Sequence, residues 1–98
     1  MHVHTVLVKL ADPADRERCR AEMLRMDGAI DGMIDLVVLT NECGGDYAAD
    51  VALCTRWVDS EAYRAYQRHP LHLQVRAVVL SLMSDAMTID YTVGSSGG

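Results

Sequence analysis

Residues 33–58 read MIDLVVLT, NECGGDYAA and DVALCTRWV, two apolar segments on either side of a polar, glycine-rich one. The apolar segments are short and rich in β-branched and aliphatic residues, which favours strands. The middle segment, residues 41–49, has the composition of a turn. The stretch therefore predicts a β-hairpin, with strands at residues 33–40 and 50–58.

Before the hairpin, residues 2–10 (HVHTVLVKL) alternate as in a strand. One face, which we assign to the helix side, carries His2, His4, Val6, Val8 and Leu10. Asp12 and Pro13 then have the residue types of an N-cap and a first helical position. A single helical stripe follows, made by Cys19, Met23, Met26 and Ile30. We expect this helix to end at Gly28 or Gly32.

After the hairpin, Asp59 is the expected N-cap of a second helix, which Pro70 stops near His69. A third helical segment is indicated by the spacing of Leu71, Val75, Val78, Val79 and Leu82. Residues 86–93 (AMTIDYTV) alternate as a fourth strand. The order is β-α-β-β-α-β, which predicts an α+β, ferredoxin-like domain: a four-stranded antiparallel sheet with helices on one face.

The apolar content exceeds what one small core can bury. The chain has 98 residues, of which 50% are apolar, and a monomer of this size has a marginal core. The second strand is apolar on both sides, with Met33, Val37 and Leu39 on one and Ile34, Leu36 and Val38 on the other. Because the helices cover only one sheet face, we predict a homodimer in which two sheets meet face to face. Residues 1–93 would form this single domain, and residues 94–98 a flexible Gly/Ser tail.

Charge and cysteine content restrict the partners. The net charge of −5 disfavours binding to nucleic acid or to an anionic membrane surface, and no apolar run is long enough to span a bilayer. The amino terminus lacks the pattern of a signal peptide. Cys19, Cys43 and Cys54 have no CxxC spacing, so we interpret them as reduced, mostly buried residues of a cytoplasmic protein rather than zinc ligands or a disulfide framework.

The four histidines form two close pairs, His2-x-His4 and His69-Pro70-Leu71-His72. The break after Tyr66 should place the second pair near the mouth of the space between helices and sheet, facing His4. A neutral imidazole can remove a proton, and a tyrosine hydroxyl can bind a carbonyl oxygen or an oxyanion. Two alternatives stay open: the histidines cap helix ends or satisfy buried groups, or the two pairs hold a divalent metal.

Several of these segments resemble the stress-responsive dimeric α/β-barrel (Dabb) family, from about residue 2 to residue 93. The specific parts are the string Tyr66-x-x-His69-Pro70-x-His72 and the terminal Asp90-Tyr91, and the resemblance also covers residues 4–10, 30–33 and 50–57. Asp31 stands where the family usually has proline, and Trp57 where it usually has phenylalanine. The resemblance implies a ferredoxin-like protomer whose sheet pairs into a dimeric barrel.

The sequence resembles one branch of this family in particular, the olivetolic acid cyclase-type polyketide cyclases. Enzymes of that branch close a linear tetraketide thioester by aldol condensation without a cofactor. By that resemblance His72 would be the general base, while Tyr66 and His4 would bind oxygen atoms of a small hydrophobic, carbonyl-containing ligand. Enzymes of this branch carry a tyrosine in the first helix. In this sequence Met23 and Met26 occupy that stretch, so the tyrosine has no counterpart. The alternatives are a non-catalytic, stress-responsive dimer and a dimeric-barrel monooxygenase.

Overall fold

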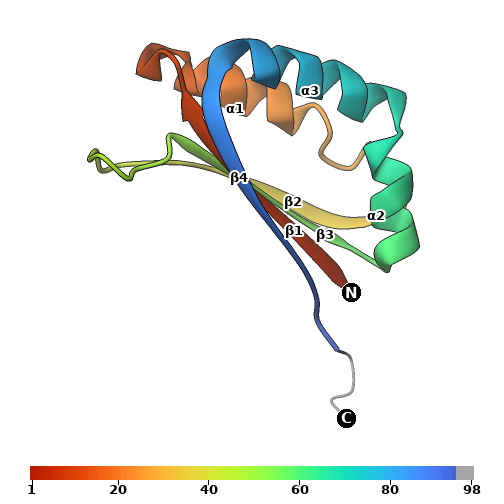
Figure 1. Cartoon of the computed structure of the whole chain (residues 1–98). Helices are drawn as coiled ribbons and strands as arrows, with labels where there is room; N and C mark the ends of the chain where they lie inside the picture. The colour runs from red at the N-terminus through yellow and green to blue at the C-terminus, as the bar shows by residue number, and fades with distance from the viewer. Residues whose placement is uncertain (95–98) are drawn as a thin grey trace.

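The computed structural model describes residues 1–94 and forms a four-stranded sheet with helices packed on one of its faces (Figure 1). The elements follow in the order β1 (His2–Leu10), the 3-10 helix η1 (Pro13–Asp15), α1 (Arg16–Leu24), β2 (Met33–Thr40), β3 (Val51–Trp57), α2 (Ser60–Gln67), α3 (Pro70–Leu82) and β4 (Met83–Thr92). Residues 95–98 of the predicted Gly/Ser tail lie outside the described residues. The ferredoxin-like order is confirmed.

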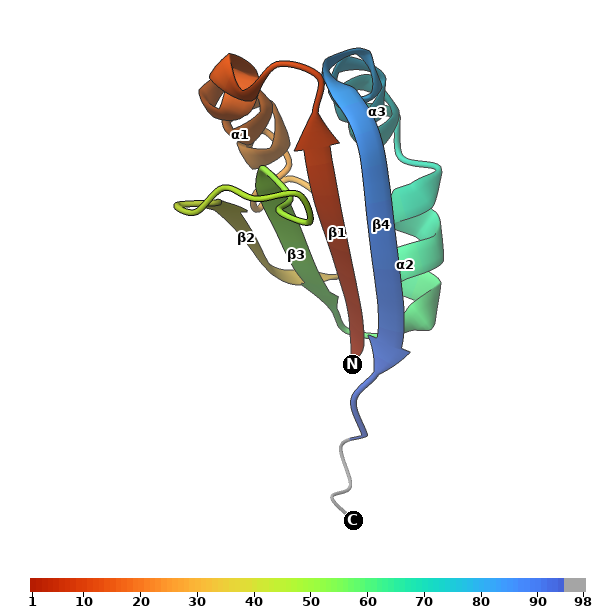
Figure 2. The same ribbon diagram turned by 60° about the vertical axis from the view of Figure 1, so that its left-hand side comes forward.

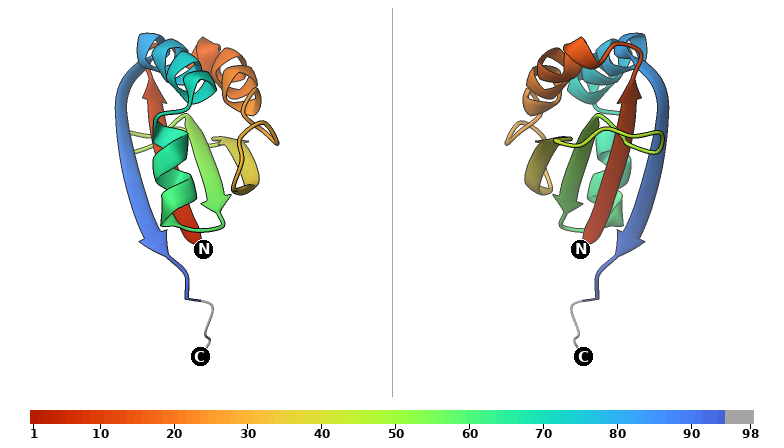
Figure 3. Two further views of the ribbon diagram at one scale, coloured as in Figure 1. Left: turned by 90° about the vertical axis from the view of Figure 1, so that its right-hand side faces the viewer. Right: turned by 90° about the vertical axis from the view of Figure 1, so that its left-hand side faces the viewer.

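The strands run in the order β2-β3-β1-β4, and every neighbouring pair is antiparallel (Figure 2). β1 and β3 are central, whereas β2 and β4 form the two edges. All of the helices lie on the same side of the sheet, and the opposite face carries none of them (Figure 3). This arrangement leaves β4 at one edge of the helix-covered layer, which is where the site described below is found.

The core lies between the sheet and the helices. The predicted alternation of β3 is confirmed, because Val51, Leu53, Thr55 and Trp57 are all buried. The predicted stripe of the first helix is also buried, at Cys19, Met23, Met26 and Ile30. Of the two other cysteines, Cys54 is partly buried and Cys43 is exposed in the β2–β3 loop, so the expectation of burial is wrong for Cys43.

Three predicted boundaries are corrected by the structure. α1 ends at Leu24, before either glycine, and turns continue the chain to β2. Asp12 caps the short helix η1 that precedes α1, with Oδ1 accepting from the Ala14 N–H at 3.0 Å. β4 begins at Met83, directly after α3 and three positions earlier than residue 86.

The predicted faces of β2 are wrong at its start because of a β-bulge. Met33 pairs with Trp57 and Leu36 with Thr55, so Ile34 and Asp35 together stand opposite Arg56. Such an extra residue shifts the alternation by one position. Met33 therefore packs against the helix-side core, whereas Ile34 is 47% exposed.

The face of the sheet that carries no helix is apolar. Its large exposed side chains, which we call the open sheet face, are Leu7, Val37, Leu39, Met87, Ile89 and Tyr91. Met87 and Ile89 on β4 are 72% and 60% exposed, and Leu39 on β2 is 59% exposed; so much exposed apolar surface on one face is unusual for a small domain. None of the helices formed by residues 1–94 has the length and apolar character needed to cross a membrane.

Candidate active site

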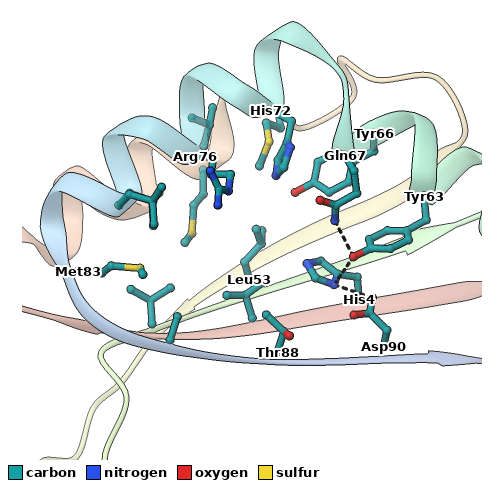
Figure 4. Close-up of a pocket in the computed structure, with 18 residues that line it drawn as sticks. His4, Leu53, Tyr63, Tyr66, Gln67, His72, Arg76, Met83, Thr88 and Asp90 are labelled. Carbon is teal, nitrogen blue, oxygen red and sulfur yellow. Dashed lines mark hydrogen bonds and ion pairs between the residues drawn. The ribbon is translucent and has the colours of Figure 1, made fainter.

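A cavity of about 390 Å³ lies between the sheet and the helices, beside β4 (Figure 4). One end is polar and is lined by His4, Tyr63, Tyr66, Gln67, His72 and Asp90. The remainder is mostly apolar and includes Val6, Met23, Met26, Leu53, Val79 and Met83. Cavities of this size and mixed character are typical of small-molecule sites.

The break between α2 and α3 positions the two aromatic rings at the polar end. His69 is the N-cap of α3, where its Nδ1 accepts from the Leu71 N–H at 3.1 Å, and Pro70 occupies the first turn. Beyond this turn the ring of His72 packs on that of Tyr66, with centroids 4.1 Å apart. His69 therefore caps a helix end, which is one of the alternatives that the sequence left open for the histidines. It does not line the cavity.

His4 is held in orientation by Asp90, its partner across the β1–β4 ladder. The Nδ1 atom of His4 lies 2.7 Å from Asp90 Oδ1, and Nε2 of His2 lies 3.0 Å from the same oxygen. Because a carboxylate only accepts hydrogen bonds, both histidines donate to it. In a neutral His4 ring this bond leaves Nε2 as an acceptor.

The Asp90 carboxylate stays ionised in this setting. Burial alone would raise the pKa of Asp90, but hydrogen bonds from His2 and His4 outweigh that cost and hold the pKa below its usual value. The charge needed to orient His4 is thus present throughout the neutral range.

Tyr63 joins this group to α2. Its hydroxyl accepts from Gln67 Nε2 at 2.6 Å and lies 3.2 Å from His4 Nδ1, and its ring stacks on that of His2 at 4.2 Å. Burial and the nearby Asp90 carboxylate raise the pKa of Tyr63 to about 12, so the hydroxyl keeps its proton at neutral pH.

His72 and Tyr66 are both in their neutral forms. Burial lowers the pKa of His72, and the Arg76 guanidinium lowers it further, while a backbone hydrogen bond at Gln67 opposes the shift. The Nδ1 atom of His72 is buried and has no hydrogen-bond partner among residues 1–94. Burial and Tyr63 raise the pKa of Tyr66, which keeps its hydroxyl a donor. A neutral base and a neutral donor thus stand in contact.

A comparison with protein-family models matches residues 3–93 to the Stress responsive A/B Barrel Domain, or Dabb. The chain belongs to this family. No curated protein matches the sequence.

Solved structures of similar proteins have the same fold. A dimeric ferredoxin-like protein of unknown function from Thermobifida fusca superposes with a TM-score of 0.83 at 19% identity, covering 94% of this chain and 90% of the other. A Dabb family protein from Mesorhizobium loti gives 0.79 at 21% identity, with 96% and 97% covered. A variant of SnoaB, a cofactor-independent oxygenase from Streptomyces nogalater, gives 0.70 at 16% identity, with 97% and 93% covered. Further matches are also described as dimeric.

The three residues proposed from the sequence, His4, Tyr66 and His72, all line this one cavity of the Dabb fold. The two histidine pairs do not converge as a metal site: within residues 1–94 no three His, Cys, Asp or Glu side chains are grouped to hold an ion. Trp57 is fully buried and packs on Tyr66 at 4.5 Å between ring centroids, as a core residue.

Three polar residues of the site were missed from the sequence. Tyr63 and Gln67 lie three positions before and one after Tyr66, on the α2 face turned toward the sheet. The sequence indicates Asp90 only as part of the terminal Asp90-Tyr91 of the resemblance, whereas the structure places it on the helix-side face of β4 with Thr88 and Ala86. Its pairing with His4 depends on the β1–β4 register, which a single strand pattern does not contain.

Proposed function

We propose that this protein is a cofactor-independent acid/base enzyme that acts on a carbonyl-rich, polyketide-like substrate and promotes an aldol-type cyclisation. The observation that supports this most directly is the cavity itself, in which a neutral imidazole, a neutral phenol and a carboxylate-oriented histidine meet an apolar chamber. The resemblance of this sequence to the polyketide cyclases of the Dabb family also supports the proposal.

In the proposed reaction His72 is the general base. It removes a proton from a carbon next to a carbonyl group, and the resulting enolate carbon attacks a second carbonyl carbon to form the new C–C bond. The alkoxide produced takes its proton from the protonated His72, either directly or through Tyr66, which His72 then reprotonates, so the base is regenerated. The depressed pKa of His72 keeps its ring unprotonated, and thus able to act as a base, at neutral pH.

His4 would contact a substrate oxygen through Nε2. Because Asp90 holds the Nδ1–H, a neutral His4 accepts a hydrogen bond from an enol hydroxyl, whereas a protonated His4 donates one to a carbonyl oxygen.

Proton abstraction can be tested without knowing the natural substrate. A β-keto thioester with an alkyl tail, in D₂O under conditions where uncatalysed exchange is slow, should exchange its α-protons faster with the protein. His72→Ala should reduce the accelerated rate by about 10²-fold or more, the usual range for loss of a general base.

The matched control is His69→Asn, which removes the other histidine of the string but keeps an N-cap acceptor for the Leu71 N–H. It should leave exchange unchanged. Equal accelerated rates for wild-type protein and His72→Ala, with both variants folded by circular dichroism, would remove His72 from the mechanism. No acceleration by the wild-type protein would leave the non-catalytic alternative.

A second candidate function is oxygenation, favoured by the likeness to a cofactor-independent oxygenase. The same proton removal from an electron-rich phenol or anthrone would give a carbanion that reacts with O₂ directly. Oxygen consumption with an anthrone substrate distinguishes the two functions, because the cyclisation consumes no oxygen.

We infer in addition that the protein forms a homodimer through the open sheet face. The large apolar side chains exposed there and the dimeric state described for structural relatives support this assembly.

A further inference from the structure

Arg76 is placed in the cavity without a role in the chemistry above. It follows His72 by one helical turn on α3 and lines the same cavity, and Figure 4 shows its guanidinium on the inner side of the helix. Most exposed arginines on small domains point into solvent or pair with a carboxylate. Arg76 is exposed and lines a cavity whose walls are partly apolar, so its guanidinium is available to a ligand there.

Arg76 differs in its contacts from four of the seven other arginines, whereas Arg18, Arg64 and Arg68 also form no ion pair within residues 1–94. Arg16, Arg20, Arg25 and Arg56 each form an ion pair with an aspartate or glutamate. Within residues 1–94, Arg76 forms no ion pair, and the carboxylate among the cavity-lining residues, Asp90, is bound by His2 and His4. The guanidinium of Arg76 therefore has no carboxylate in direct contact with it, and the charged Asp90 elsewhere in the lining is bound to the two histidines.

We propose that Arg76 binds the carboxylate of an organic acid whose apolar body fills the cavity. The planar guanidinium matches a carboxylate in a two-bond, forked contact. The following turn of α3 supplies Val79 and Leu80 along the cavity wall, and β4 begins there with Met83, which suits an aliphatic or aromatic tail. This rests on the proposed function in one respect: the substrate whose carbonyl group meets His72 would carry a free carboxylate in addition to its reacting carbonyl group.

The spacing between Arg76 and His72 restricts the chemical class of the ligand further. Arg76 and His72 stand four positions apart on one face of α3, so their side chains are neighbours. A carboxylate at Arg76 and a reacting carbonyl at His72 would then be a few bonds apart in one molecule. A keto acid or an acyl-substituted aromatic acid has this spacing.

The test compares two ligands of the same length, octanoate and octanamide, by isothermal titration calorimetry. Wild-type protein should bind octanoate about tenfold more tightly, as expected for a charge-assisted, forked contact at a partly open site. In Arg76→Gln this preference should disappear while the octanamide affinity stays the same, and Arg76→Lys should keep part of it.

Arg68→Gln is the matched control, because Arg68 is exposed at the end of α2 and lies outside the cavity lining; it should keep the preference. In a ¹⁵N spectrum of wild-type protein, octanoate should shift the Arg76 side-chain Nε–H signal and octanamide should not.

The outcomes separate this inference from the proposed function. If both ligands bind equally to wild-type protein, or if Arg76→Gln keeps the preference, the carboxylate site is overturned and the acid/base site is unaffected. If neither ligand binds wild-type protein, the carboxylate site is overturned, and the acid/base site is judged by α-proton exchange alone. Loss of α-proton exchange in His72→Ala with octanoate preference intact would support both.

Discussion

Asp90 is the charged residue that orients His4. Its Oδ1 accepts from both His2 and His4, and Asp90→Asn would replace this charged acceptor with a neutral amide oxygen, which is a weaker partner for both donors. Because the Asp90 side chain is 35% exposed, we expect a loss of about 1–2 kcal/mol in the free energy of unfolding at neutral pH, measured by urea titration.

The pH dependence of that loss has a defined sign. The folded-state pKa of Asp90 lies below its usual value, so the carboxylate stabilises the folded protein above about pH 4 and this contribution disappears as pH falls through the folded pKa. The difference between wild-type protein and Asp90→Asn should therefore shrink in acid. Asp46→Asn, in the exposed β2–β3 loop, is the control; a difference that stays constant into strong acid would contradict the role of the charge.

A second prediction for a single residue concerns the pKa of His72. Since burial and Arg76 lower its pKa, the acid limb of the α-proton exchange rate should lie below pH 6.5, the usual value for histidine. Arg76→Gln removes a nearby positive charge, so the limb should move upward toward that value. A pH–rate profile of both proteins measures this shift, and a limb that moves downward or stays fixed would show that another group titrates.

Individual site residues differ in how far the sequence reveals them. His4, Tyr66 and His72 could be named because alternation on one strand and a proline-broken helix place them toward the same space. Tyr63, Gln67 and Asp90 could not, because their importance lies in hydrogen bonds across elements. Strand register and the angle between α2 and α3 determine those bonds, and neither is encoded in a local pattern.

At the scale of elements, the start of β2 depends on a close approach between Gly32 and α2. Gly32 has φ +83°, and a Cβ atom there would lie 2.5 Å from the Cβ of Ala62. Gly28, in the preceding turn, has φ +70° but open space around it. A comparison of the same substitution at Gly28 and at Gly32 therefore separates the cost of backbone strain from the cost of steric overlap.

We predict that Gly28→Ala costs about 1 kcal/mol of the free energy of unfolding, the usual penalty of a left-handed conformation, and that Gly32→Ala costs about 2–4 kcal/mol because overpacking is added. Chemical denaturation of the two variants measures both values. Equal losses would mean that α2 moves away from Gly32 without cost.

The elements also show where sequence patterns stop being sufficient. The caps at Asp59 and His69 were predictable, since they depend on side chains and the amides next to them. The end of α1 was not, because Met26 and Ile30 stay buried in turns after the helix ends; apolar spacing reports burial and not backbone hydrogen bonding. The bulge in β2 arises from its pairing with β3.

At the scale of the whole molecule, the excess of apolar residues is divided between two places. Part of it lines the cavity, and part covers the open sheet face, where Ile89 on β4 and Leu39 on β2 lie at opposite edges of the sheet. A surface that extends from edge to edge fits a second sheet better than a small ligand, which supports a two-fold dimer.

Ile89→Lys tests this dimer. A two-fold axis brings the substituted side chain into the interface twice, and each buried, unpaired ammonium group is costly. We expect the wild-type protein to sediment as a dimer at micromolar concentration and Ile89→Lys as a monomer. Leu73→Lys changes an equally apolar side chain, 50% exposed on α3 away from the open sheet face, and should remain dimeric. If Leu73→Lys dissociates and Ile89→Lys does not, the subunits meet through their helices, and the open sheet face needs another partner.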